Sequence, residues 1–315
     1  MKILVTGGAG FIASHIVDEY VKLGHEVSII DNLSTGRRMN INPAATFYEA
    51  DIRDAARVRE IFERERFDVV NHHAAQMDVR KSVEDPVYDA SVNIIGVLTL
   101  LEACIRTKVT QVIFASSGGA IYGEQDYFPA DEEHPTRPIS PYGVAKLTTE
   151  QYLFYYKAVY GLDSVSLRYA NIYGPRQNPE GEAGVVAIFS TKLLSGGQPI
   201  INGDGKQTRD YVFVSDVVRA NVLSLQYRGS AVFNIGTGIE TDVNSLFHQL
   251  KKAIHARADE QHGPAKKGEQ LRSVLSSAKI QKELGWKPLV SMEEGLQRTV
   301  EYFRMKEGYG AKALA

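Results

Sequence analysis

A glycine-rich turn directly follows the first apolar stretch of the chain. The segment KILVTGGAGFIAS (residues 2–14) passes from a short β-branched stretch, through Gly7 and Gly10, into an amphipathic pattern. Glycines at such a turn let the backbone approach a pyrophosphate, and the following helix offers unpaired N–H groups and the positive end of its dipole. Ala13 takes the third position of the glycine pattern. Because the strand, the turn and the helix occur together, the segment predicts a dinucleotide-binding unit.

The first 174 residues alternate strand-like and helix-like patterns. Strands are expected at 2–7, 26–31, 46–51, 68–74, 111–117 and 163–171, with amphipathic helical segments between them. This alternation predicts an α/β fold with a Rossmann-type, doubly wound parallel sheet. We expect residues 1–174 to form an NAD-binding domain. Residues 175–315 are expected to form mainly a smaller, mixed α/β substrate-binding domain, with the segment 209–238 returning to the first domain.

The composition is that of a globular enzyme. Of the 315 residues, 43% are apolar and the net charge is only −2, so no basic surface for nucleic acid is indicated. No apolar run approaches the roughly 20 residues of a membrane span. Cys104 is the one cysteine, which excludes an internal disulfide, and its amphipathic surroundings predict a buried side chain. We expect a cytoplasmic enzyme without a metal site, because His72 and His73 have no further ligand at a suitable spacing.

Acidic residues end the second and third predicted strands. Asp31 lies 24 residues after Gly7 (31 − 7), where a carboxylate accepts hydrogen bonds from the adenosine ribose hydroxyls. The same carboxylate repels the 2′-phosphate of NADP, so the sequence favours NAD, although Arg37 and Arg38 leave NADP open. The alternative is that Asp31 only stabilises the turn DNLSTG. Asp51 ends the next strand, where an acid can meet the adenine amino group.

Tyr142 and Lys146 lie four residues apart at a predicted helix start. Ser140 is a good N-cap and Pro141 suits the first helical position, so the two side chains share one helix face. A tyrosine has a pKa of about 10 in water. The Lys146 ammonium and a positively charged nicotinamide are expected to lower this pKa, so that the phenol can accept a hydroxyl proton. The alternative is an exposed pair on a polar helix face.

Small and polar residues end two neighbouring strands. Ser116 and Ser117 close the strand 111–117 at the sheet edge where such folds bind ligands, and we expect Ser117, with Ser116 as the alternative, to contact a reacting hydroxyl. His73, Ala74 and Ala75 end the preceding strand and leave room for a cofactor. The residues predicted to contact NAD are Gly7, Gly10, Phe11, Ile12, Asp31, Asn32, Ser34, Thr35, Gly36, Asp51, Ile52, His73, Ala74, Ala75, Tyr142 and Lys146.

Eight stretches together resemble one superfamily. TGGAGFIAS, DNLSTG, HHAAQ, SSGGAIYGE, SPYGVAK, LRYANIYGPRQ, GDGKQTRDYVFVSDV and NIGTG are similar to the extended short-chain dehydrogenase/reductases, and among them to the nucleotide-sugar 4-epimerases. The likeness spans nearly the whole chain. It implies an isomerase with tightly bound NAD that interconverts UDP-glucose and UDP-galactose through a 4-keto sugar. Tyr142 would remove the proton of the 4-hydroxyl, Lys146 would hold the nicotinamide ribose, and Ser117 would share the hydrogen bond to the 4-oxygen.

The resemblance also implies a substrate site. Asn171, Arg209 and Arg272 would bind the diphosphate, and the segment 181–189, through Val185 and Val186, would line the uridine pocket. Ser273 stands where some epimerases carry a bulky tyrosine beside sugar carbon 2, so the N-acetylhexosamine pair is a further expected substrate class. The substrate-binding residues are thus Ser117, Tyr142, Asn171, Val185, Val186, Arg209, Arg272 and Ser273.

Three other activities are compatible with such a fold. A 4,6-dehydratase needs an Asp-Glu pair after the serine, and Gly118 and Gly119 stand there instead. UDP-glucuronate 4-epimerisation stays open, because the same machinery would serve it. A non-catalytic NAD-binding regulator would be expected to lose Tyr142 or Lys146. The resemblance further implies a homodimer formed through the apolar helices at 90–105 and 146–161.

Overall fold

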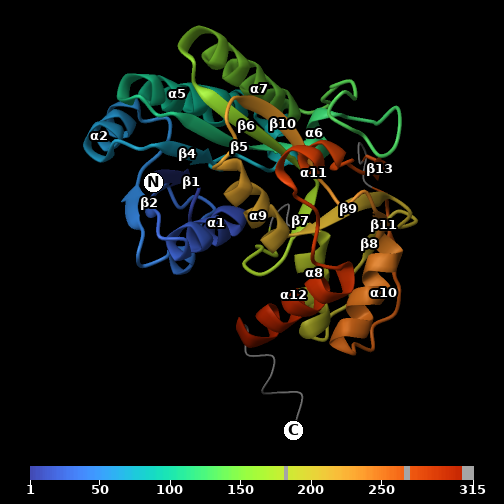
Figure 1. Cartoon of the computed structure of the whole chain (residues 1–315). Coiled ribbons are helices and arrows are strands. Elements are labelled where there is room, and N and C mark those ends of the chain that lie inside the picture. Colours follow the sequence, from blue (N-terminus) through green and yellow to red (C-terminus); the bar gives the residue numbers. More distant parts are fainter. Residues whose placement is uncertain (181–183, 266–269, 307–315) are drawn as a thin grey trace.

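Seven parallel strands form the central sheet of the computed structural model, which describes residues 1–180, 184–265 and 270–306 (Figure 1). The strand order is β10-β6-β5-β4-β1-β2-β3, and every neighbouring pair is parallel. The predicted doubly wound sheet is therefore confirmed. Its strands are β1 (Lys2–Thr6), β2 (Glu26–Asp31), β3 (Thr46–Glu49), β4 (Val69–His72), β5 (Gln111–Ser117), β6 (Asp163–Tyr169) and β10 (Ser230–Ile235).

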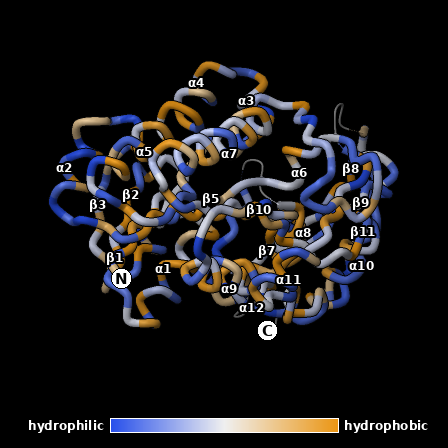
Figure 2. The backbone as a smooth tube through the Cα atoms, turned by 45° about the horizontal axis from the view of Figure 1, so that its top comes forward, coloured by the Kyte–Doolittle hydropathy of each residue, from blue (hydrophilic) through white to orange (hydrophobic). Residues whose placement is uncertain are grey.

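Helices cover both faces of this sheet, and the sheet separates two apolar cores. Helices α1 (Phe11–Lys22) and α9 (Val214–Ser224) pack on one face. Helices α2 (Ala55–Glu65), α5 (Gly96–Thr107) and α7 (Pro141–Tyr160) pack on the other. In Figure 2 the outer side of α2 is hydrophilic, as expected for a helix that buries one stripe. The remaining elements of this region are α3 (Val79–Glu84), α4 (Pro86–Ala90), η1 (Arg38–Asn40) and α6 (Gly118–Ile121).

One continuous helical stretch, Pro86–Thr107, is long and apolar enough to span a membrane by length and composition alone. It runs from α4 through the π-helical turn η2 (Ser91–Ile95) into α5. The α5 part buries Val97, Leu100 and Leu101 against β4 and β5. We therefore describe it as a core helix of the α/β layer.

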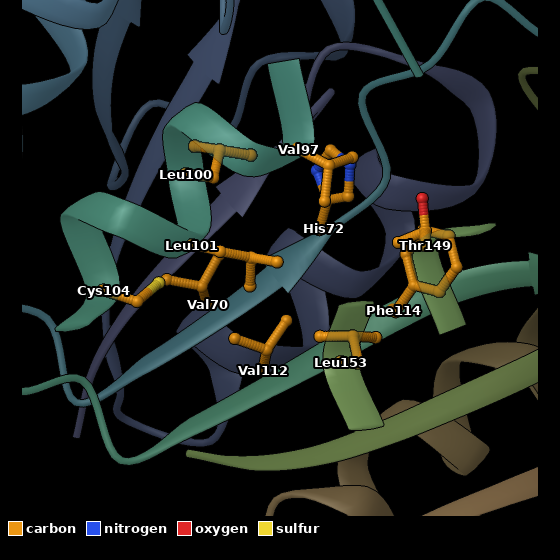
Figure 3. A pocket seen from close by; sticks show the side chains of 10 residues that line it. All are labelled: Val70, His72, Val97, Leu100, Leu101, Cys104, Val112, Phe114, Thr149 and Leu153. Atoms are coloured by element: carbon orange, nitrogen blue, oxygen red, sulfur yellow. The ribbon is translucent and has the colours of Figure 1, made fainter. Parts of the chain in front are cut away.

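The interface between α5 and the sheet leaves a cavity of about 10 Å³ (Figure 3). Cys104 points into it beside Val70 and Val112. Such a volume holds one water at most. Burial raises the pKa of the Cys104 thiol far above its usual value, so this cysteine is an inert core residue, as its amphipathic surroundings predict.

A smaller unit follows the large sheet. Strand β9 (Thr208–Phe213) pairs with β7 (Asn171–Tyr173), β11 (Glu240–Asp242) and β13 (Arg272–Ser273). A two-stranded pair joins β8 (Ile201–Asn202) to β12 (His262–Gly263). Helices α8 (Val185–Leu194), α10 (Val243–Ile254) and α12 (Met292–Lys306) share a third apolar core, and α11 (Ala278–Leu284) lies against β10.

The chain passes back and forth between the two units, and the units also pair through their backbones. Residues 214–235 carry α9 and β10 back to the large sheet, whereas β9, just before them, belongs to the small sheet. In the other direction, Ala130 pairs with the strand that continues β13: its N–H donates to Val274 O at 3.0 Å, and its carbonyl accepts from Ser276 N at 2.7 Å. These crossings bring β13 to the carboxyl end of β5.

Candidate active site

The glycine turn after β1 lies directly against the end of β4. Gly7 has a φ of +70°, and a Cβ atom there would lie 2.7 Å from the backbone nitrogen of Ala74. Gly10 caps α1 without any side-chain hydrogen bond, so the first N–H groups of α1 face outward from the turn. Phe11 and Ile12 are partly buried in its first turn. The turn has no room for a side chain at Gly7, and it suits a pyrophosphate.

Asp31 lies beside the same turn at the end of β2. Its carboxylate is 7% exposed and accepts hydrogen bonds from Ala9 N at 3.0 Å and Leu33 N at 2.8 Å. Burial raises the pKa of Asp31, and these two backbone bonds lower it in part. Gly36 packs against this carboxylate, and Ser34 and Thr35 are exposed in the adjoining loop. The arrangement keeps an acid at the position where an adenosine ribose would lie.

The two arginines near Asp31 are occupied elsewhere. The Arg37 side chain donates to Asn178 Oδ1 at 2.8 Å, and Arg38 forms an ion pair with Glu49. Neither contacts Asp31 through any hydrogen bond in the described residues. Among the described residues, the Arg37 and Arg38 side chains are thus bonded away from Asp31, in line with the predicted preference for NAD.

Asp51 and Asn32 meet at the neighbouring strand ends. Asn32 Nδ2 donates to Asp51 Oδ2 at 3.1 Å, and Arg53 binds both oxygens of Asp51 at 2.8–2.9 Å. The hydrogen bond from Arg53 is the main reason why the pKa of Asp51 falls to about 2. Ile52 is buried against Gly96. Asp51 is therefore an ionised acceptor over the range of physiological pH.

The end of β4 is organised by Thr6. The Thr6 hydroxyl lies 2.7 Å from His72 Nδ1, and it accepts from the backbone nitrogens of His73 and Ala74 at 3.2 Å each. The His73 ring meets the Tyr169 hydroxyl at 3.1 Å. Burial lowers the pKa of His73 to about 3, so the ring is neutral. Ala75 follows as a small, partly buried residue.

Helix α7 begins as the sequence indicates. The Ser140 hydroxyl accepts from Gly143 N at 3.1 Å, and Pro141 is the first helical residue. This start places Tyr142 next to the end of β5, where the Ser117 side chain lies near enough to lower the pKa of the phenol in part. The structure therefore brings together the phenol and the serine that the sequence predicts to act on one hydroxyl. Ser116, the alternative, points instead to Glu150 at 2.6 Å.

The pKa of Tyr142 reflects the burial of its side chain. Burial raises it above the usual value, the charge of Asp89 raises it further, and only the Ser117 side chain lowers it. In the chain by itself, desolvation of the phenolate outweighs the other contributions, so the net pKa of Tyr142 lies above its usual value. That Lys146 and a bound, positively charged nicotinamide lower this pKa stays a prediction.

Lys146 lies one turn further along α7 and is 5% exposed. Its Nζ donates to Ala115 O at 2.8 Å and lies 5.6 Å from the centre of the Tyr142 ring. Burial lowers the pKa of Lys146 to about 8, although the carboxylates of Asp89 and Glu150 raise it. The side chain is thus an ammonium at neutral pH, and the alternative of an exposed pair on a polar helix face does not hold.

The substrate-side residues fall into two groups. Ser273 is 2% exposed, stands in register with Arg209 across β13 and β9, and lies 3.9 Å from where a Cβ of Gly119 would be. Successive strand residues point to opposite faces, so Arg209 and Ser273 share the face near the end of β5. Arg272 points to the other face. It pairs with Glu240 at 2.6 Å and stacks on the Phe128 ring at 3.7 Å.

The other predicted substrate contacts lie on β7 and α8, the first elements of the small unit along the chain. Asn171 begins β7 and is partly buried. Val185 and Val186 form the first turn of α8, and Val186 is part of the third apolar core. Residues 181–183 of the expected uridine segment lie outside the described residues.

Sequence reasoning missed two buried acids near the pair. Asp89 on α4 accepts from Gln76 and Asn93 at 2.9 Å each, and it influences both Tyr142 and Lys146. Glu150 lies one turn beyond Lys146. An acid four residues after Lys146 was visible in the sequence, but its partner, Arg168, lies on a different element. Among the described residues no group of His, Cys, Asp and Glu could hold a metal ion.

These observations define a class: a Rossmann-fold, nicotinamide-dependent enzyme with a serine, a tyrosine and a lysine beside its cofactor cleft. The profile of the NAD-dependent epimerase/dehydratase family matches residues 3–236. The chain belongs to this family.

Three relatives are similar over nearly their whole length. The UDP-glucose 4-epimerase of Mycolicibacterium smegmatis is 44% identical, covering 97% of this chain and 99% of that protein. The crystal structure of UDP-glucose 4-epimerase from Thermotoga maritima with UDP-glucose is 50% identical with a TM-score of 0.96, covering 98% and 100% of the two chains. The Thermus thermophilus UDP-glucose 4-epimerase in complex with NAD is 45% identical with a TM-score of 0.92, covering 96% and 99%.

Proposed function

We propose that this chain is an NAD-dependent isomerase that interconverts UDP-glucose and UDP-galactose by inverting sugar carbon 4. The observation that carries the proposal is the meeting of the Tyr142 phenol with Ser117 at the end of β5, beside the buried ammonium of Lys146, whose Nζ lies 5.6 Å from the Tyr142 ring. That arrangement suits the removal of an alcohol proton. The similarity to UDP-glucose 4-epimerases over nearly the full length supports the substrate class.

The chain has a cradle that suits NAD. Gly7 and Gly10 would receive the pyrophosphate, Asp31 the adenosine ribose, and Asp51 with Ile52 the adenine, while the backbone of residues 73–75 borders the nicotinamide side. Lys146 would donate to the nicotinamide ribose. When bound, NAD supplies a reversible hydride acceptor for carbon 4 and a positive ring charge that favours the Tyr142 phenolate.

Tyr142 is the group that moves the proton in this proposal. As the phenolate, Tyr142 accepts the proton of the sugar 4-hydroxyl and becomes a neutral phenol. It returns this proton to the same sugar oxygen after the keto sugar has rotated, which restores the phenolate. Ser117 keeps a hydrogen bond to that oxygen in both directions. The diphosphate anchors the rest of the substrate through Arg209 and Asn171. Arg272, the third predicted contact, lies on the opposite face of β13 and would have to leave Glu240 to reach the diphosphate. Such remote binding lets the sugar rotate without leaving the site.

The direct test is a panel of UDP-sugars incubated with the purified protein and no added reductant. Interconversion of UDP-glucose and UDP-galactose is the expected result. Turnover of UDP-glucuronate alone would identify a UDP-glucuronate 4-epimerase instead. Binding of NAD without turnover of any sugar would instead favour a non-catalytic regulator.

We also propose that the N-acetylhexosamine pair is accepted. Ser273 forms a small, buried wall beside Gly119, so the pocket lacks a bulky side chain at this point. Replacing Ser273 with Tyr is expected to reduce kcat/KM for UDP-N-acetylglucosamine by about 100-fold, because the ring would occupy the space for the acetyl group. UDP-glucose turnover should change by less than fivefold. Leu271→Tyr, two residues away on an exposed position, is the matched control. Wild type that does not turn over UDP-N-acetylglucosamine would end this part of the proposal.

A homodimer formed through α5 and α7 completes the proposal. Large apolar side chains on the outer side of α7 are exposed, including Phe154 at 72% and Val159 at 56%. Burying such a patch in a symmetric contact would stabilise a dimer. Phe154→Arg is expected to give monomers in sedimentation velocity, whereas an unchanged sedimentation coefficient would locate any dimer elsewhere. A cytoplasmic, reducing location fits the single buried cysteine.

A further inference from the structure

A buried ion pair lies one helical turn beyond Lys146. The side chains of Glu150 on α7 and Arg168 on β6 are 4% and 7% exposed. Arg168 donates to Glu150 twice, from Nη2 to Oε2 at 2.7 Å and from Nε to Oε1 at 3.0 Å. The Ser116 hydroxyl donates to the same Oε1 at 2.6 Å. One carboxylate on α7, the helix that carries Tyr142 and Lys146, therefore contacts two strands: β6 through Arg168, and β5, which ends in Ser117, through Ser116.

The pair continues into a connected polar network. Arg168 Nη1 donates to the Tyr122 hydroxyl at 2.8 Å, and that hydroxyl donates to Asn234 Oδ1 on β10 at 2.8 Å. Tyr122 follows α6, the short helix that starts directly after Ser117. Within the described part of the chain, none of these polar side chains is left buried without a partner. A fully connected buried network holds its members in one geometry.

We propose that Glu150 and Arg168 are positioning residues, whose ion pair fixes α7 against the ends of β5 and β6 and thereby sets the separation of the Tyr142 and Ser117 hydroxyls. The inference rests on the proposed function for its catalytic consequence. Stability alone does not account for the pair, because buried ion pairs can often be replaced by apolar residues without loss of stability. What the pair supplies is a fixed contact between α7 and two strands.

Glu150 also acts on Lys146 through its charge. Its carboxylate raises the pKa of Lys146, which burial holds at about 8. Removing this charge should therefore lower the Lys146 pKa further, so that the ammonium is lost at a lower pH. The other charged or titratable groups facing Lys146 are Asp89 from α4, His72 and His73 from β4, and Tyr142 from α7.

Two variants and one control test this inference. Glu150→Leu/Arg168→Met removes both charges while keeping side-chain volume, and Ser116→Ala removes one hydrogen bond while keeping the pair. Lys157→Met is the matched control, because it breaks the Lys157–Asp163 pair at the far end of α7. We expect kcat to fall about 100-fold in the double variant and about threefold to tenfold in Ser116→Ala, because small displacements of reacting groups have such effects. The KM for UDP-galactose should change by less than threefold, and Lys157→Met should match wild type.

A second measurement separates positioning from a merely structural role. Calorimetry measures the Kd of NAD between pH 6.5 and 9.5 without any sugar. The pH above which NAD binding weakens should shift to a lower value only in the double variant. A folded double variant that keeps the wild-type kcat and the wild-type pH dependence of NAD binding would overturn the inference. The inference would also be overturned if kcat fell only in proportion to the fraction of folded protein at every temperature, because the pair would then act on stability alone. If the double variant does not fold, a wild-type kcat in Ser116→Ala overturns it. A wild type that binds NAD but turns over no UDP-sugar would overturn the proposed function, while the NAD titrations would still decide the effect of Glu150 on Lys146.

Discussion

Tyr142→Phe is expected to lower kcat for UDP-galactose by about 1,000-fold, the range lost when a positioned acid–base group is removed. The change removes one hydroxyl, next to Ser117, and leaves the ring in place beside Lys146. The KM and the Kd of NAD should stay within threefold of wild type, because neither the diphosphate contacts nor the glycine turn is altered. Initial rates from a chromatographic assay of the two UDP-sugars give the measurement.

Tyr152→Phe is the matched control on the same helix, since Tyr152 packs against the apolar core rather than the cleft. It should have wild-type rates. Retention of more than a tenth of the activity in Tyr142→Phe would mean that another group moves the proton. A large loss of NAD affinity in that variant would assign the tyrosine to cofactor binding instead.

Gly7→Ala is expected to weaken NAD binding by about 100-fold and to lower Tm by several degrees. Two effects add. The φ of +70° costs a residue with a Cβ about 1–2 kcal/mol, and the new Cβ would lie 2.7 Å from Ala74 N. The end of β4 would have to move away from the turn, which would open the site where the pyrophosphate is expected. Calorimetric titration of NAD and thermal unfolding measure the two effects separately.

Gly24→Ala is the control that separates backbone strain from the close contact between a Cβ at residue 7 and Ala74 N. Gly24 has a φ of +80°, and no atom lies within 4 Å of the position that a Cβ would take, so the variant carries the backbone strain without the contact. We expect a lower Tm but unchanged NAD affinity. Equal losses of affinity in both variants would show a general effect of strain, and unchanged affinity in Gly7→Ala would contradict the placement of the pyrophosphate.

Local sequence patterns predicted the large sheet well for a physical reason. Buried parallel strands are apolar on both faces, so the predicted strands at 26–31 and 111–117 coincide with β2 and β5. The start of α7 was equally clear, because an N-cap serine and a proline specify it locally. The small sheet was harder to derive. Its strands are two to six residues long and pair across large sequence separations, which no local period reveals.

The site shows the same division. The positions of Gly7, Asp31, Tyr142 and Lys146 at strand and helix ends could be predicted because each belongs to a short motif with its own chemistry. Their roles in binding and catalysis stay predictions. The raised pKa of Tyr142 could not be predicted, because it depends on how much water the fold removes. The pairing of Glu150 with Arg168 was also hidden, since it requires the spatial order of α7 and β6.

The central claim is that carbon 4 loses its hydrogen as a hydride and regains it within one active site while Tyr142 carries the proton. UDP-galactose deuterated at carbon 4, incubated with the protein in ordinary water, tests this most directly. Mass spectrometry and NMR of the product should find the deuterium still on carbon 4 of UDP-glucose. Loss of the label to solvent during epimerisation would contradict the account.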